Sequence, residues 1–182
     1  MTALDAVLMR QSYSKVTEDA PSHEDLLPLV AAAASVADHG SMRPWRLIEL
    51  RGPARERLGA AFVEASGVEG KDAAKLAEKP LRASLLIAVV GRYKPSFKVP
   101  AWEQEAVASG VAHTLSLLLD EAGWGVFWRT GGHTRSESVH RMHELADGEV
   151  LLGWLYVGGK PEKSKPEKKH RFDASKVLSA LS

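Results

Sequence analysis

Three polar segments of the sequence combine residues that could bind an anionic ligand. They are Arg10-Gln11-Ser12, residues 38–45 (DHGSMRPW) and residues 128–132 (WRTGG). Arginine can hold a phosphate through two parallel hydrogen bonds, hydroxyl side chains donate further bonds, and glycine lets backbone amides approach an anion or a ring edge. One such segment alone is more often a surface arginine, a turn or a buried Trp–Arg pair. The three together predict a site for an anionic cofactor.

Familiar catalytic motifs do not account for these segments. Gly123-Trp124-Gly125 lacks the third glycine of a dinucleotide-binding loop and follows a predicted helix rather than a strand. Gly159-Lys160-Pro161 lacks the upstream glycine of a phosphate-binding loop. No Gly-x-Ser-x-Gly turn offers a nucleophilic serine. The sequence therefore does not favour a serine hydrolase or a classical nucleotide-binding protein.

Two histidines share a predicted helix at a spacing that permits zinc binding. They are His140 and His143, with Arg141 beside them, and no metzincin-type glutamate motif completes the set. The chain has no cysteine. We therefore expect an exposed helix face here and assign no metal ligand.

Composition limits the protein class. A chain of 182 residues, 45% hydrophobic and 26% charged, is typical of one globular domain. The absence of cysteine excludes disulfides, thiolate zinc sites and iron–sulfur clusters, and favours a reducing compartment. The apolar run at residues 84–90 is far shorter than the roughly 20 residues of a membrane-spanning helix, and no signal peptide is recognisable. We expect a cytoplasmic protein with no membrane partner.

Positive charge is concentrated near the C-terminus. Residues 160–171 carry six Lys or Arg and two Glu, whereas the whole chain has a net charge of only +1. Such a segment could steer phosphorylated cofactors or nucleic acid, but its Lys/Pro/Glu composition also describes a solvated tail, which we prefer. We expect one domain over residues 1–159, a basic tail over 160–182, and no nucleic-acid partner.

Hydrophobic periodicity predicts the elements that must position these segments. The predicted helices cover residues 3–9, 55–64, 72–78, 102–122 and 137–145, together with a second helix whose apolar positions run from residue 26 to residue 36 and which should stop near residues 38–40. The predicted strands cover 45–50, 85–90, 124–128 and 150–157. Ser22 and Asp25 are expected to cap the second helix, and Gly40 to take a left-handed conformation after it. The pattern is typical of a single α+β or α/β domain.

Two elements should form the centre of this domain. The uninterrupted apolar strand at 85–90 is expected to be central. The long helix at 102–122, with Pro100 in its first turn, should be the core helix. Its predicted apolar stripe is formed by Ala106, Val107, Val111, Leu115 and Leu118.

Four segments, in this order along the chain, resemble the FMN-dependent nitroreductase family and especially its compact members. The family opens with a helix and an Arg-x-Ser tripeptide, here Arg10-Gln11-Ser12, and continues with Ser-x-x-Pro-Trp, here residues 41–45. Residues 99–104 (VPAWEQ) and 128–131 (WRTG) are similar to two further segments of the compact subgroup. The order of the motifs over nearly the whole chain makes the resemblance specific.

The resemblance implies a fold, a partner and an activity. The fold would be α+β, with a central, mostly antiparallel sheet flanked by helices, in an intertwined homodimer with two FMN sites at the subunit interface. The activity would pass hydride from NAD(P)H as co-substrate through FMN to a small electron acceptor, such as a nitroaromatic or a quinone. Because the flavin does the chemistry, no catalytic acid or base is expected in the protein.

The resemblance also implies cofactor contacts, residue by residue. Arg10 and Ser12 would contact the FMN phosphate or ribityl chain, and His39 would approach the flavin across the dimer. The full expected set is Arg10, Gln11, Ser12, Ser35, His39, Ser41, Arg43, Trp128, Arg129 and Thr130.

Some positions of this chain differ from the family's usual residues. Gln11 replaces a commoner second arginine, and Ser35 replaces an arginine of the nearest relatives, for which Arg43 or Arg46 could substitute. Lys160 or Arg171 could close the phosphate site. Two alternatives stay open: another FMN-dependent reaction, such as dehalogenation or flavin breakdown, and a flavin-binding or sequestering protein with little turnover.

Overall fold

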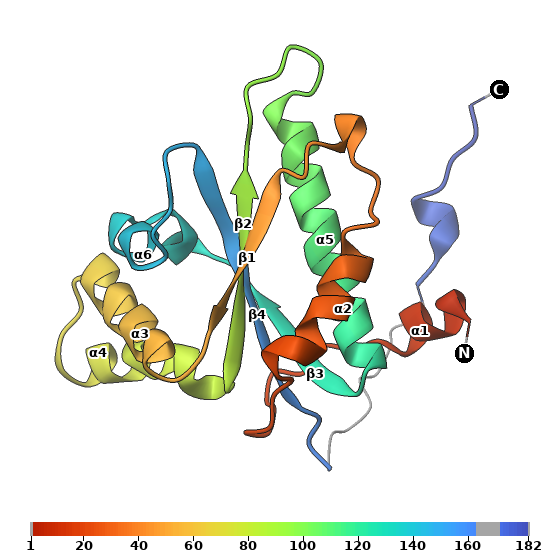
Figure 1. The fold of residues 1–182 in the computed structure, drawn as a ribbon. Coiled ribbons are helices and arrows are strands. Elements are labelled where there is room, and N and C mark those ends of the chain that lie inside the picture. The colour runs from red at the N-terminus through yellow and green to blue at the C-terminus, as the bar shows by residue number, and fades with distance from the viewer. Residues whose placement is uncertain (1, 163–171, 182) are drawn as a thin grey trace.

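A four-stranded antiparallel sheet forms the middle layer of the protein (Figure 1). The computed structural model describes residues 2–162 and 172–181. The strands are β1 (Trp45–Leu50), β2 (Leu85–Arg92), β3 (Trp124–Arg129) and β4 (Glu149–Gly159), in the order β1-β2-β4-β3. Because every neighbouring pair is antiparallel, the fold is α+β rather than α/β, as the resemblance implied.

Helices cover both faces of the sheet. They are α1 (Ala3–Met9), α2 (His23–Ala33), α3 (Pro53–Ser66), α4 (Gly70–Ala77), α5 (Ala101–Glu121) and α6 (Glu137–Met142). Short 3-10 turns are η1 (His39–Ser41), η2 (Lys79–Arg82), η3 (Gly132–Arg135) and η4 (Ala174–Lys176). The pair α2 and α5 packs on one face, and the group α3, α4 and α6 lies on the other (Figure 1).

The strand β2 confirms the predicted central strand. It lies between β1 and β4, and all of its residues from 85 to 91 are buried. Leu85 and Ile87 pack with the α2/α5 side, whereas Leu86 and Ala88 pack with the α3/α6 side. A strand buried on both faces needs an apolar residue at every position, which is why its sequence does not alternate.

Helix α5 confirms the predicted core helix, with a shifted apolar stripe. Ala108, Val111, Ala112 and Leu115 are completely buried under the sheet. The predicted stripe also contained Ala106, which is exposed. Pro100 precedes the helix as its N-cap, one position before the predicted first turn. The stripe was predicted with Ala106 because several apolar faces are possible in an alanine-rich helix, and packing against the sheet selects one of them.

The second helix begins as predicted and ends early. Ser22 and Asp25 form a reciprocal capping box, in which each side chain accepts the other residue's backbone N–H. The helix ends at Ala33 rather than near residues 38–40, so Ser35 lies outside it. Gly40 has the predicted left-handed conformation, with φ +72°, but within η1.

The C-terminal prediction is only partly within the described residues. β4 ends at Gly159, where the domain was expected to end, and residues 163–171 of the predicted basic tail lie outside the description. Residues 172–181 are exposed and include η4. In residues 2–162 and 172–181, no helix has both the length and the apolar character required to cross a membrane.

An irregularity in the β2–β4 pairing makes room for a tryptophan. The register shifts between Val89 and Val90, opposite Gly153, whose φ is +144°. A Cβ at Gly153 would collide with the carbonyl oxygen of Arg129 and lie 2.8 Å from Trp128 Nε1. The bulge therefore lets the end of β3, with Trp128 and Arg129, approach β4 closely.

We predict that Gly153→Ala lowers the free energy of unfolding by about 2–4 kcal/mol, because the new methyl combines backbone strain with a collision. Gly132→Ala is the matched control, since nothing lies within 4 Å of a Cβ there. Urea denaturation of both variants measures the effect. Equal stability of the two variants would contradict the proposed packing at the bulge.

Candidate functional site

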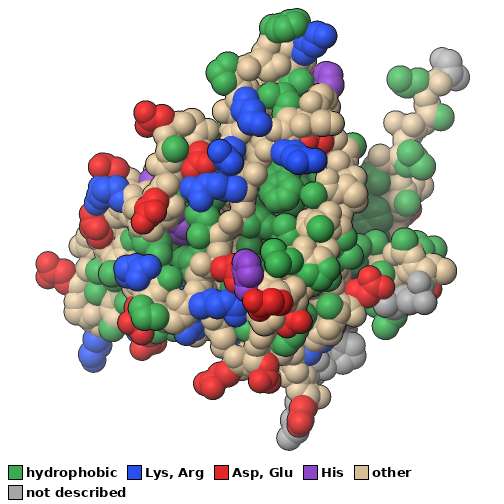
Figure 2. Space-filling model, viewed as in Figure 1, with side chains coloured by type: hydrophobic (Ala, Val, Ile, Leu, Met, Phe, Trp, Pro, Cys, Tyr) green, Lys and Arg blue, Asp and Glu red, His purple; other side chains and the backbone are tan. Residues whose placement is uncertain are grey.

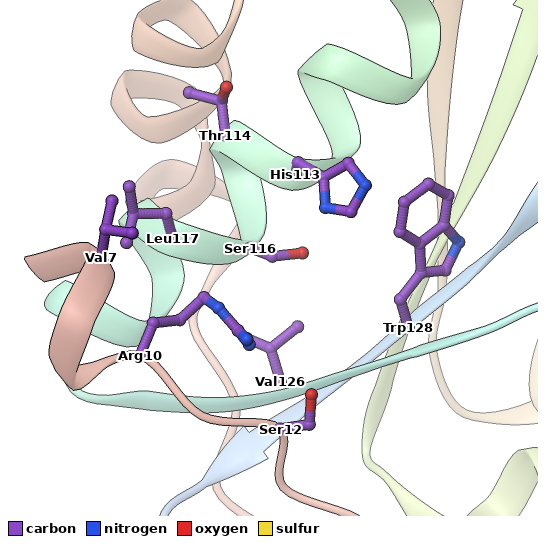
Figure 3. A pocket seen from close by; sticks show the side chains of 9 residues that line it. All are labelled: Val7, Arg10, Ser12, His113, Thr114, Ser116, Leu117, Val126 and Trp128. Atoms are coloured by element: carbon purple, nitrogen blue, oxygen red, sulfur yellow. The ribbon is translucent and has the colours of Figure 1, made fainter. Parts of the chain in front are cut away.

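A cavity of about 360 Å³ lies between α5, the end of β3 and the segment that follows α1 (Figure 3). Its walls combine polar and apolar side chains: Val7, Arg10, Ser12, His113, Thr114, Ser116, Leu117, Val126 and Trp128. Three of these, Arg10, Ser12 and Trp128, belong to the predicted set. The structure therefore brings together the first and the third of the segments singled out in the sequence.

Local hydrogen bonding places Arg10 and Ser12 in this cavity. Thr2 and Asp5 form a capping box that starts α1, and the chain becomes extended at Arg10, where α1 ends. The backbone N–H of Tyr13 donates to the carbonyl oxygen of Val126 at 2.9 Å, which holds the extended segment beside the edge strand β3. The side chains of residues 10 and 12 then share one direction, because side chains alternate along extended backbone.

Helix α5 supplies a wall that sequence reasoning missed. His113 meets the indole of Trp128 edge to face, with ring centroids 4.8 Å apart. Ser116 lies one turn further along the same helix and donates its hydroxyl to the carbonyl oxygen of Ala112. The sequence could have revealed this wall through a group of polar residues, His113, Thr114 and Ser116, among the apolar residues of the middle of α5.

The cation of the cavity lacks a partner of opposite charge among the described residues. No described carboxylate pairs with Arg10, and no Asp or Glu lines the cavity. The indole nitrogen of Trp128 is buried and points away from Arg10 and Ser12 in Figure 3, so the cavity meets the ring rather than its N–H. An unpaired guanidinium near an aromatic ring suits a ligand that carries an anionic group beside a planar ring.

The second predicted segment forms a strained loop elsewhere on the chain. Ser41 and Arg43 have positive φ values of 51° and 47°, which non-glycine residues rarely adopt. The carboxylate of Asp38 accepts the backbone N–H of Arg43 at 2.7 Å and of Met42 at 3.2 Å. The strain is therefore held by specific bonds, as is common in functional loops.

The segment at residues 99–104 packs beside this loop and contacts it. Gln104 is buried, accepts the N–H of Lys94 and donates to the carbonyl oxygens of Lys94 and Val99, all within 3.0 Å. Its neighbour Glu103 lies 2.8 Å from His39 Nδ1. The motif at residues 99–104 thus contacts the turn that carries His39.

The remaining predicted contacts do not share the first cavity within one chain. Four of them are exposed on the segment between α2 and β1: Ser35, His39, Ser41 and Arg43. Arg129 and Thr130 line a second cavity. Gln11 is half-buried and does not line either of the two cavities. Trp128 lines both cavities, whereas Arg129, the next residue of β3, lines only the second of the two, because successive side chains of a strand point to opposite faces.

A family model described as "Nitroreductase family" matches residues 7–159 of the chain. The chain belongs to the nitroreductase family. The matched residues run from α1 to the last residue of β4, so they include both cavities and the strained loop.

Two curated relatives of this nitroreductase-family protein match along most of their length. The Escherichia coli (strain K12) protein named "Putative NAD(P)H nitroreductase YdjA" is 34% identical over 161 residues, which cover 87% of this chain and 88% of the relative. A Haemophilus influenzae protein named "Putative NAD(P)H nitroreductase" is 27% identical over 172 residues, covering 92% and 93%.

Solved structures share the fold. A nitroreductase-like family protein from Bacillus cereus superposes with a TM-score of 0.86 at 22% identity, covering 100% of this chain and 96% of the other. The structure titled as FMN and NADPH-dependent nitroreductase NfnB, from sphigopyxis sp. strain HMH, gives a TM-score of 0.77 at 14% identity and full coverage of both chains. The predicted fold is confirmed.

Three other predicted cations of this nitroreductase-family protein are already paired or lie outside the described residues. Arg46 binds Glu149 through two hydrogen bonds, at 2.8 and 2.7 Å, so it cannot easily substitute for the arginine absent at position 35. Lys160 donates to the carbonyl oxygen of Asp120 at 2.7 Å and lies 3.1 Å from its carboxylate. Arg171 lies outside the described residues.

The expectation of an exposed face at His140 and His143 is wrong for His143. This ring is buried, Nδ1 lies 2.8 Å from the carbonyl oxygen of Val139, and Nε2 accepts a hydrogen bond from Trp154 Nε1 at 3.0 Å. Burial lowers the pKa of His143, so the ring is neutral and can accept this bond. Among the described residues, no group of three or more His, Cys, Asp or Glu is arranged to hold a metal.

The Arg46–Glu149 pair predicts an acid-dependent part of stability. Hydrogen bonds from Arg46 hold the pKa of Glu149 below its ordinary value of 4.5, against the effect of burial. The pair therefore stabilises the fold fully above that value and is lost as the pH falls through the lower, folded-state pKa. Arg92, 3.2 Å from Glu149, retains part of the effect in any variant of Arg46.

We predict that Arg46→Gln lowers the free energy of unfolding by about 1–3 kcal/mol at pH 7, and that its difference from the unmodified protein shrinks below pH 4.5. Urea denaturation from pH 7 to pH 3 measures both. Arg57→Gln, an exposed cation on α3, is the control. A difference that stays constant at every pH would contradict the assignment.

Proposed function

We propose that the protein is an FMN-dependent oxidoreductase that passes hydride from NAD(P)H through FMN to nitroaromatic or quinone-like acceptors. The observation that carries the proposal is the first cavity, where Arg10 has no described carboxylate partner and lies in one lining with Ser12 and the aromatic rings of His113 and Trp128. Membership of the nitroreductase family supports it, as does the fold shared with a protein titled as FMN and NADPH-dependent.

Different residues of the cavity would contact different parts of the cofactor. Arg10 would hold the phosphate through its guanidinium, and Ser12 would donate a hydroxyl to the phosphate or the ribityl chain. His113 and Trp128 would offer a polar, aromatic wall, while Val7 and Leu117 would exclude water from one side. FMN, once bound, supplies the capacity to accept and release hydride, so the protein needs no acid–base pair of its own.

We also propose that the working unit is a homodimer. Leu4, Val7, Leu8 and Met9 of α1 are 56–68% exposed, and Phe172, Val177 and Leu178 near the C-terminus are more than 70% exposed. Hydrophobic side chains are visible on both segments at the right of Figure 2. Two exposed apolar segments in one small protein are typical of a surface that a second copy covers.

A dimer would also complete the cofactor site. His39, Ser41 and Arg43 lie in an ordered, strained loop that is exposed in the single chain. In the proposed dimer this loop would approach the first cavity of the other copy, where Arg43 could provide the cation that Ser35 does not. The alternative of a flavin-sequestering protein shares this site and differs only in turnover.

We predict that the purified protein is yellow and oxidises NADH or NADPH when a nitroaromatic or a quinone is present. Visible absorbance and the decrease of NAD(P)H absorbance measure the two parts separately. Stoichiometric FMN without NAD(P)H oxidation would favour the sequestering alternative. A colourless protein that cannot be reconstituted with FMN would contradict the proposal.

We predict that Arg10→Ala weakens FMN binding about 10- to 150-fold, because a charge-assisted hydrogen bond contributes about 1.5–3 kcal/mol. Fluorescence titration of the cofactor-free protein with FMN measures the affinity. Arg57→Ala, on the opposite side of the sheet, is the matched control. Equal affinities of the two variants would remove Arg10 from the site.

A further inference from the structure

A second cavity, of about 380 Å³, opens on the α3/α6 side of the sheet. Its floor is made of buried aromatic side chains: Phe62, Trp154 and Tyr156 are each at most 4% exposed. Phe62 meets Trp154 edge to face, with ring centroids 5.3 Å apart, and stacks on His133 at 4.6 Å. The faces of these rings are largely covered, so the aromatic surface open to a planar ring comes from the half-buried rings of Phe127 and His133 in the same lining.

Cations surround this aromatic floor. Lys79 and Arg82 project from η2 at the exposed mouth, and Arg129 enters from the end of β3. The guanidinium of Arg129 lies 4.5 Å from the centroid of Phe127 and 5.1 Å from that of Tyr156. Stacking on two rings holds this charge in place without a carboxylate.

No acidic side chain balances these charges. None of the lining residues is Asp or Glu, and no described carboxylate forms an ion pair with Lys79, Arg82 or Arg129. Arg129 Nε is buried and has no hydrogen-bond partner among the described residues. Three like charges around one hollow repel one another, and an anion in that hollow would relieve the repulsion.

Two titratable groups of the cavity add donors rather than negative charge. Burial lowers the pKa of His133, and the charge of Lys79 adds to this effect. Burial raises the pKa of Tyr156 to about 12, against the opposing charges of Arg129 and Arg82, so the phenol stays protonated at neutral pH. The cavity therefore combines aromatic surface, positive charge and a phenolic donor.

We propose that this second cavity is a binding site for aromatic carboxylates, separate from the cofactor site. The ring of the ligand would lie against the half-buried rings of Phe127 and His133, and its carboxylate would face Lys79 and Arg82 at the mouth. The site does not depend on FMN, because its lining comes from the opposite side of the sheet and shares only Trp128 with the first cavity.

The test uses 2-naphthoate and its neutral analogue 2-naphthamide, which differ in charge but hardly in shape. Calorimetric titration of the full chain, with and without added FMN, gives the affinity of each. We expect one naphthoate per chain, bound at least tenfold more tightly than the amide, with a weaker affinity at high salt. Because neither compound is an electron acceptor, turnover does not enter the measurement.

Exposed-residue variants locate the ligand without threatening the fold. Lys79→Gln combined with Arg82→Gln should reduce naphthoate affinity at least tenfold and leave naphthamide unchanged. Lys71→Gln, an exposed cation on the neighbouring helix α4, is the matched control and should change neither affinity. Arg10→Ala should also leave naphthoate binding intact, although it weakens FMN binding.

Three outcomes would overturn the proposal. They are equal affinity for naphthoate and naphthamide, no effect of the Lys79/Arg82 double variant, and displacement of naphthoate by FMN, which would mean a shared site. If naphthoate binds as expected to a chain that never binds FMN, the second site stands and the proposed oxidoreductase function fails. The two ideas are therefore tested independently.

Discussion

The burial of β2 and β4 between two helical layers is the constraint on which the rest of the structure depends. Each strand supplies apolar side chains to both faces, so α2 with α5 and α3 with α6 form two cores that share one sheet. Each core leaves a cavity near the end of β3, one on each side. The bulge at Gly153 brings these cavities together around a single tryptophan, because it allows β3 to approach where a side chain would prevent it.

Uncompensated positive charge is the common feature of both cavities. Some cations elsewhere are paired, as Arg46 is with Glu149 and Lys160 with Asp120, and others such as Arg57 are exposed to solvent. Beside the cavities, Arg10, Arg82 and Arg129 have no described carboxylate partner. Their gathering around two hollows whose described linings contain no Asp or Glu is what favours an anion in each.

Sequence reasoning failed where a residue's surroundings come from distant segments. The predicted exposed histidine His143 is buried at the end of α6, where Trp154 of β4 donates a hydrogen bond to it. Arg46 seemed available as a replacement cation until the fold placed Glu149, far along the chain, against it. His113 was not predicted as a site residue, because only the packing of α5 against β3 places its ring beside Trp128.

The sequence alone determined the elements, the central strand, the core helix and the family resemblance, because periodicity and motif order are local properties of the chain. It also determined that Arg10, Ser12 and Trp128 were candidates for one site. Only the tertiary structure decided which candidates meet. It placed Trp128 beside both cavities and Arg129 beside the second of the two, and it left His39 and Arg43 on an exposed loop away from Arg10. Such placement depends on strand pairing and helix packing between residues a hundred positions apart, which no local pattern encodes.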